Sequence, residues 1–74
     1  MDLSGANLEG AELNGANLKE AKLDDANLTG ANLKRANLKN AKVNNTNLSR
    51  ANLTDTILEG VVLSGLILDD ESIS

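Results

Sequence analysis

Two runs of carboxylates in this 74-residue sequence could take part in catalysis or metal binding. Asp24 and Asp25 form one run, and Asp69, Asp70 and Glu71 form the other. Adjacent carboxylates can act as general acid and base or bind calcium. The sequence has no His and no Cys, and neither run has the spacing of an EF-hand loop. We therefore expect no enzyme activity, no catalytic residue, no metal site and no cofactor.

Positive charge is concentrated in the middle of the sequence. Residues 31–50 contain five basic and no acidic side chains, which form a basic belt: Lys34, Arg35, Lys39, Lys42 and Arg50. Residues 1–30 sum to −4 and residues 51–74 to −5. The basic belt is either a site for an anion or acidic partner around Arg35 and Lys39, or a solvated rim. There is no aromatic side chain for nucleobases to stack on, so we expect no direct nucleic-acid binding.

A repeat of five residues positions these side chains. The third residue is Leu in thirteen of fifteen units, and the first is Ala in most of them. Five residues advance a helix by about 500°, which scatters the leucines around the axis, and an odd repeat flips them between the faces of a strand. The chain must therefore turn once per repeat, with the first and third residues inside and the second outside.

The fifth residue of the repeat indicates the type of turn. It is Gly, Asn or Asp at most corners, and these residues tolerate the positive φ of a type II turn. We predict type II turns at the corner that contains Gly5, Asp25, Asn45 and Gly65. We predict a different turn at Glu20, Arg35 and Arg50.

Tandem A(N/D)LXX units cover all 74 residues and resemble the pentapeptide-repeat family. The resemblance implies an all-β fold: a right-handed quadrilateral parallel β-helix, a solenoid with twenty residues per coil and about 3.7 coils. A single solenoid domain is expected over residues 1–74. On this fold the leucines stack in four inner columns, which are Leu3, Leu23, Val43 and Leu63; Leu8, Leu28, Leu48 and Leu68; Leu13, Leu33, Leu53 and Ile73; and Leu18, Leu38 and Leu58.

Residues 56–74 depart from the pattern, because apolar residues replace polar ones at the outward second position. This apolar C-terminal coil is either a cap or a dimer interface, since a contiguous apolar surface on a small chain usually marks a contact. The residues expected at the interface are Ile57, Val62, Leu66, Ile67 and Ile73. The repeated Asn residues at the second position, such as Asn7, Asn27 and Asn47, are expected to bond water, backbone or one another rather than a ligand.

The sequence thus favours a non-enzymatic structural or protein-interaction solenoid, which forms a homodimer through its C-terminal coil or binds an unidentified protein partner. The family resemblance offers an alternative, a DNA mimic that binds DNA gyrase, as some larger members do. A rod of about 18 Å interrupted by the basic belt matches little of a DNA turn of about 34 Å. The resemblance implies a bacterial source, with cyanobacteria prominent. No signal peptide or membrane span is apparent, so we expect a cytoplasmic location and no membrane partner.

Overall fold

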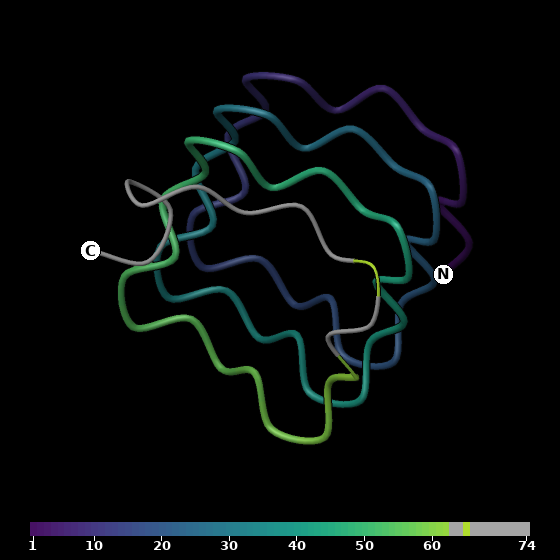
Figure 1. Cartoon of the computed structure of the whole chain (residues 1–74). Helices are drawn as coiled ribbons and strands as arrows, with labels where there is room; N and C mark the ends of the chain where they lie inside the picture. The colour runs from purple at the N-terminus through teal and green to yellow at the C-terminus, as the bar shows by residue number, and fades with distance from the viewer. Residues whose placement is uncertain (63–64, 66–74) are drawn as a thin grey trace.

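The computed structural model describes residues 1–62 and 65, and within them the chain is a coil without helices or continuous strands. Nine isolated parallel β-bridges each join residues twenty apart, from Asp2 and Lys22 to Lys42 and Val62. Residues 1–20, 21–40 and 41–60 therefore form three stacked coils, called here coils 1, 2 and 3 (Figure 1). Of the further coil expected from the sequence, only residues 61, 62 and 65 lie within the described part.

Every fifth residue is a corner of the same kind. From Gly5 to Gly65 all of these residues have positive φ, between 57° and 75°. The amide three residues after each inner Leu bonds back to its carbonyl, as Ala6 N–H does to Leu3 at 3.0 Å. A bonded turn with positive φ only at its third residue is type II. Because there are twenty residues per coil and a corner at every fifth, the coil has four sides, as the resemblance implied.

The prediction of a different turn at three of the corners is wrong. Glu20, Arg35 and Arg50 have φ of 62°, 63° and 61°, in the left-handed region that L-residues disfavour. The hydrogen bonds between coils explain why they adopt it. The fifth-residue amide donates to the next coil, as Glu20 N–H does to the Lys39 carbonyl at 2.8 Å, so the stacking geometry fixes φ regardless of residue type. The side chains of all three residues are exposed to solvent.

Alanine and leucine fill the interior of the solenoid. The leucines of coil 2, Leu23, Leu28, Leu33 and Leu38, are at most 1% exposed. Among the described residues, 1–62 and 65, the buried apolar core is Leu18, Ala21, Leu23, Ala26, Leu28, Ala31, Leu33, Ala36, Leu38, Ala41, Val43, Leu48 and Ala51. First and third positions thus point inward, as the repeat predicts, and each coil covers the apolar layer of its neighbour.

One described leucine of the inner columns has an exposed side chain. Leu58, at the third position of its repeat, is 38% exposed, whereas Leu38 directly above it is 1% exposed. Leu38 lies between Leu18 and Leu58 in its column, whereas no residue of the described part, 1–62 and 65, stacks on the other side of Leu58. The inward-facing side chain of Leu58 is therefore accessible to solvent at this end of the described coils.

Threonine replaces alanine at two inward positions of coil 3. Thr46 is fully buried, and its hydroxyl donates to the Leu23 carbonyl of the coil above at 2.6 Å. Thr56 repeats the contact with the Leu33 carbonyl at 2.7 Å. Since a buried hydroxyl is costly without a partner, this bond is what allows Thr to stand in place of Ala.

Candidate functional site

The outward Asn residues stabilise the backbone. In every described repeat with Asn or Asp at the second position, the side-chain Oδ1 accepts a bond from the amide two residues later. Asn27, for example, accepts from Thr29 N–H at 3.0 Å and from the Thr29 hydroxyl at 2.6 Å. These are Asx turns, which satisfy an amide that the coil leaves unbonded. The expected partners thus include the backbone, and the oxygens of the Asn columns are already engaged.

Asp2 forms the same Asx turn, with a carboxylate in place of the Asn amide. Its Oδ1 accepts from Ser4 N–H at 3.1 Å. This backbone bond is the main cause that lowers the pKa of the Asp2 carboxyl, with smaller help from the Ser4 hydroxyl and the charge of Lys22. The Asp2 carboxylate therefore stabilises the backbone turn on the first side of the solenoid.

The two carboxylates of the first run lie in different environments. Asp24 is half-buried and accepts from Asn44 N–H at 2.9 Å, while Asp25 is exposed at a corner. Within residues 1–62 and 65, no group of three or more ligating side chains could hold a metal ion. The second run, Asp69, Asp70 and Glu71, lies outside the described residues.

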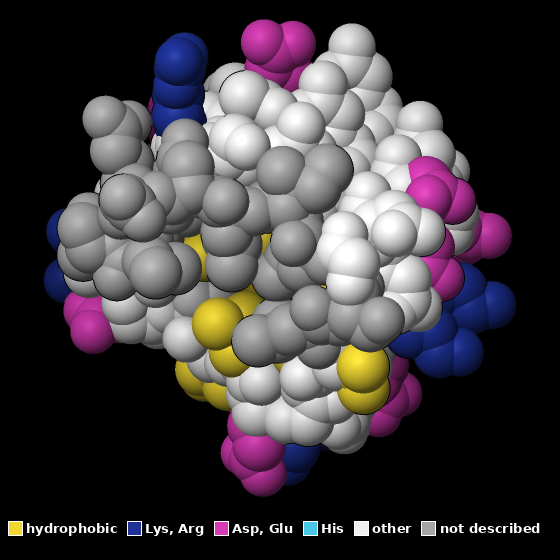
Figure 2. All heavy atoms as spheres, viewed as in Figure 1, with side chains coloured by type: hydrophobic (Ala, Val, Ile, Leu, Met, Phe, Trp, Pro, Cys, Tyr) yellow, Lys and Arg dark blue, Asp and Glu magenta, His cyan; other side chains and the backbone are white. Residues whose placement is uncertain are grey.

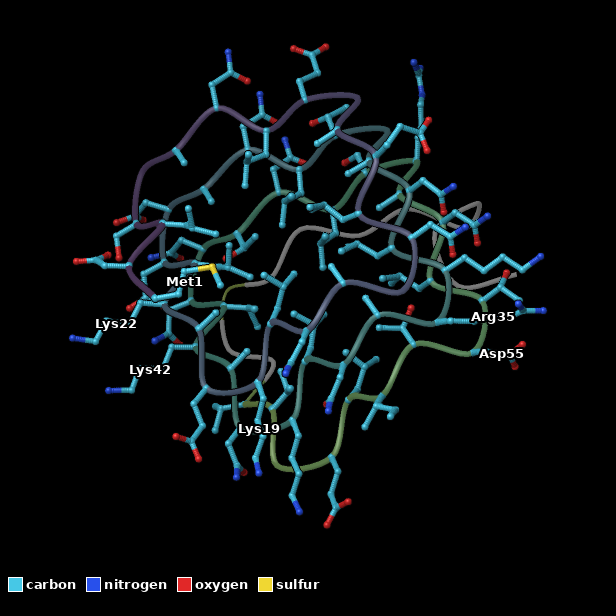
Figure 3. The ribbon with its side chains drawn as sticks, turned by 180° about the vertical axis from the view of Figure 1, so that it is seen from behind. Met1, Lys19, Lys22, Arg35, Lys42 and Asp55 are labelled. Atoms are coloured by element: carbon cyan, nitrogen blue, oxygen red, sulfur yellow. The ribbon has the colours of Figure 1, made fainter. Side chains whose placement is uncertain are left out.

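The basic belt is distributed around the solenoid. The four-sided coil places Lys42 on the first side, Arg50 at the end of the second, Lys34 and Arg35 on the third and Lys39 on the fourth. Figure 3 shows Lys22 and Lys42 on one flank and Arg35 with Asp55 on the opposite flank. Lys39 Nζ lies 4.0 Å from Glu59 Oε1. These cations therefore do not converge on one site.

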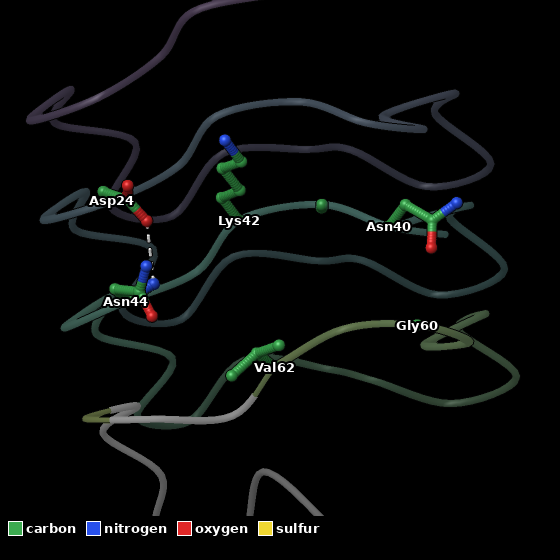
Figure 4. A pocket seen from close by; sticks show the side chains of 7 residues that line it. Asp24, Asn40, Lys42, Asn44, Gly60 and Val62 are labelled. Carbon is green, nitrogen blue, oxygen red and sulfur yellow. Dashed lines mark hydrogen bonds between the residues drawn. The ribbon is translucent and has the colours of Figure 1, made fainter.

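A shallow hollow of 430 Å³ lies on the first side, between coils 2 and 3 and residue 62 (Figure 4). Its lining includes Asp24, Asn40, Lys42, Asn44 and Val62. Lys42 occupies the second position here, so no Asx turn forms, and the Asn44 amide bonds the Asp24 carboxylate instead. The hollow combines one cation, one anion and amides, and it is open to solvent. Sequence reasoning missed it, although Lys at a second position was the available signal.

The strongest candidate site is an apolar surface at the C-terminal end of the described coils. Ile57, Leu58 and Val62 are 46%, 38% and 66% exposed, and we call them the end patch. Ile57 and Val62 belong to the interface expected from the sequence, and Leu58 was not expected there. Figure 2 shows apolar side chains at this end of the molecule. Leu66, Ile67 and Ile73 lie outside the described residues.

The fold and its surfaces define a class: a four-sided parallel β-solenoid built from five-residue repeats. The sequence pattern of pentapeptide repeats matches residues 2–40 and 31–70 in eight copies. The chain therefore belongs to the pentapeptide-repeat family. Members of this family are in general structural or interaction proteins.

Solved structures of the family resemble the chain. Rfr23, a pentapeptide repeat protein from the cyanobacterium Cyanothece 51142, is 35% identical over 95% of this chain and 51% of its own, with a TM-score of 0.74. A pentapeptide repeat protein of the Arabidopsis thaliana thylakoid lumen is 29% identical over 88% of this chain and 45% of its own, with a TM-score of 0.85.

A third similar structure is QnrB1, a plasmid-mediated fluoroquinolone resistance protein. It is 25% identical over 93% of this chain and 37% of its own, with a TM-score of 0.56. The chain thus spans about half or less of these relatives. A search of curated proteins gave no match. In the part of the chain that is described, no helix has the length and apolar character needed to cross a membrane.

Proposed function

We propose that the chain is a non-enzymatic interaction module, a right-handed solenoid of bacterial origin located in the cytoplasm, and that it pairs with a second copy of itself through the end patch. The observation that carries this proposal is the exposure of Ile57, Leu58 and Val62. The matching outward positions one coil above are polar, Asn37 above Ile57 and Lys42 above Val62. The end patch thus replaces polar outward positions of the preceding coil with apolar ones, and two copies can bury it against each other.

The backbone supports a contact made by side chains at this end. Toward the next coil, each side of a coil presents two amides and one carbonyl, as Leu3 N–H, Gly5 N–H and the Met1 carbonyl do toward coil 2. Two such edges facing each other would oppose donor to donor. Association of two C-terminal ends therefore depends on apolar burial, which the end patch supplies.

Molar mass in solution tests the proposal. We expect a dimer for the native chain and a folded monomer for the Ile57→Lys, Val62→Lys double variant, measured by size-exclusion chromatography with light scattering. Ser4→Lys with Asn14→Lys adds the same charge at exposed positions of coil 1, away from the patch, and should leave the dimer intact. A native chain that is monomeric at all concentrations, or a dimer that survives both lysines of the patch, would contradict the proposal.

The likeness to QnrB1 supports a second candidate, the binding of DNA gyrase as a DNA mimic. A mimic needs a continuous negative surface. Among residues 1–62 and 65, no outward column contains two carboxylates, and Lys22 and Lys42 follow Asp2 down the first side. This charge pattern argues against the interpretation of the chain as a DNA mimic. Inhibition of gyrase in a supercoiling assay at low micromolar protein would establish it, and no effect at large excess would dispose of it.

A further inference from the structure

Asn14 and Gly15 form the only Asn-Gly pair in the sequence. In such a pair the glycine nitrogen can attack the Cγ of the Asn side chain, because glycine has no Cβ to hinder the approach. The new N–C bond closes a five-membered succinimide, and the side-chain nitrogen leaves as ammonia with the proton of the glycine amide. Water then opens the ring at either carbonyl and leaves an aspartyl or an isoaspartyl residue. The pair is therefore a candidate site of spontaneous deamidation.

The other asparagines are less suited to this reaction. Each Asn at a second position precedes a Leu, and its Oδ1 is held in an Asx turn. Asn40, Asn44 and Asn45 precede residues that carry a Cβ. Asn14, by contrast, is exposed, and its side chain makes no hydrogen bond with any residue that the structure describes. Its Cγ is thus the least hindered target in the chain.

Stacking on coil 2 restrains the attacking nitrogen. Gly15 N–H donates to the Lys34 carbonyl at 2.8 Å, and the nitrogen must lose this proton in order to react. Gly15 has a φ of 72°, and Ala16 N–H bonds back to the Leu13 carbonyl at 2.9 Å. Asn14 is therefore the second residue of a type II turn. Both the hydrogen bond between coils and the turn hold the pair in one conformation.

That conformation does not permit ring closure. The second residue of a type II turn has a ψ of about +120°. The ring needs Cγ and the Gly15 nitrogen on the same side of the Asn14 Cα–C bond, which requires a ψ of the opposite sign, in a region that L-residues disfavour. The peptide plane between Asn14 and Gly15 must therefore rotate, and this rotation breaks the bond to the Lys34 carbonyl. Deamidation thus requires local opening of the third side of coil 1.

The two products differ in their main chain. The aspartyl product keeps the five-residue repeat and adds one carboxylate to the outward column that contains Lys34. The isoaspartyl product carries the main chain through Cβ and Cγ, which inserts one atom between the amides of Leu13 and Gly15. These amides donate to the carbonyls of Asn32 at 2.7 Å and Lys34 at 2.8 Å, whose spacing is set by coil 2. The lengthened segment no longer matches that spacing.

We propose that Asn14 and Gly15 form a modification site, at which deamidation is suppressed while the third side of coil 1 is stacked on coil 2 and proceeds when that side opens. The isoaspartyl product cannot restore the stacked corner, so the reaction converts a transient opening into a permanent change of the chain. This inference goes beyond the proposed interaction function and involves no residue of the end patch.

Deamidation rates of the full chain, folded and unfolded, test the role of stacking. We expect Asn14 to deamidate at least about tenfold more slowly in the folded chain than in concentrated guanidinium chloride, because only the open fraction reacts. The folded sample contains sodium chloride at the same concentration and pH, and peptide mapping by tandem mass spectrometry locates the modified residue. Asn40, which precedes Ala41, is the internal reference and should react more slowly than Asn14 in the unfolded chain. Equal rates for Asn14 in the two states, or faster reaction of Asn40, would overturn the proposal.

Amide hydrogen exchange tests the effect of the isoaspartyl product. The matched control is Asn14→Asp, which has the same charge and an ordinary main chain. We expect the amides of Leu13 and Gly15 to exchange at least about tenfold faster in the purified isoaspartyl form than in Asn14→Asp. Equal exchange would show that the corner accommodates the extra atom and would overturn this part of the proposal. Neither measurement depends on the end patch, so failure here is distinct from failure of the proposed dimer.

Discussion

Coil 2 and the end patch are made from the same repeat, yet they present opposite surfaces. In coil 2, Leu38 is 1% exposed and the outward residues are polar, whereas at the end of the same column Leu58 is 38% exposed beside Ile57. An inward position of the repeat is therefore not buried to the same degree in every coil. The comparison shows that burial in a solenoid belongs to the stack of coils and not to the individual repeat.

Leucine truncation should separate the two regions most strongly. Leu33→Ala in coil 2 opens a cavity in a fully buried column, and we expect a loss of about 2–5 kcal/mol in the free energy of unfolding. Leu58→Ala should cost less than half of that, because its side chain is already partly exposed. Urea unfolding followed by circular dichroism measures both. Equal losses would mean that the end of the stack is as well covered as its middle.

Two glycine corners, one in coil 2 and one in coil 3, provide a second comparison of the middle and the end of the described coils. A Cβ at Gly60 would collide with the Asn40 Oδ1, while a Cβ at Gly30 meets nothing within 4 Å, and both residues have positive φ. Gly30→Ala should therefore cost only the left-handed backbone penalty, about 1–2 kcal/mol, and Gly60→Ala should cost more because Asn40 must move. Thermal unfolding of the two variants checks the order. Identical shifts in the melting temperature would show that the Asn40 side chain yields freely.

A third test concerns the corner that the sequence mispredicted. Arg35 has a φ of 63° with an exposed side chain, so Arg35→Gly should relieve backbone strain and raise stability by up to about 1 kcal/mol. Asn40, a corner on the next side with a φ of 59°, is the matched site, and Asn40→Gly should gain less because Asn tolerates this region. Urea midpoints would decide, and a clear destabilisation by Arg35→Gly would argue against the type II corner.

The smallest effect is expected at Asp2, at the other end of the stack. Its carboxyl pKa lies below the ordinary value, chiefly because Ser4 N–H donates to it. The stabilisation that results is present above the unfolded pKa and is lost as the pH falls through the folded pKa. An NMR titration should show the lowered midpoint. Ser4→Ala should preserve most of the lowering, because it keeps the amide, and a return to the ordinary value would assign the effect to the hydroxyl.

Much of the fold was accessible from the sequence. The period of five excluded a helix and a strand, and the first and third residues predicted the buried core, as Ala21 and Leu23 show. The family resemblance added the four-sided coil, which the bridges between residues twenty apart confirm. The prediction failed at Glu20 and its equivalents because local preference was weighed without the hydrogen bonds between coils.

The candidate sites were less accessible. Ile57 and Val62 were visible as breaks in the pattern, but Leu58 follows the repeat and its exposure could be recognised only from the structure. The basic belt looked continuous in the sequence, although the coil distributes Lys42 and Arg35 to different sides. Interaction of the end patch with a second copy remains a prediction.

The sequence by itself determined the period, the inward and outward positions and the absence of His, Cys and aromatic side chains, because these are properties of each repeat. Only the tertiary structure decided which residues become neighbours twenty positions apart. Stacking imposes positive φ on Arg35 and buries the Thr46 hydroxyl against the Leu23 carbonyl. These features arise between coils, where hydrogen bonds and apolar contacts join residues that the repeat itself does not distinguish.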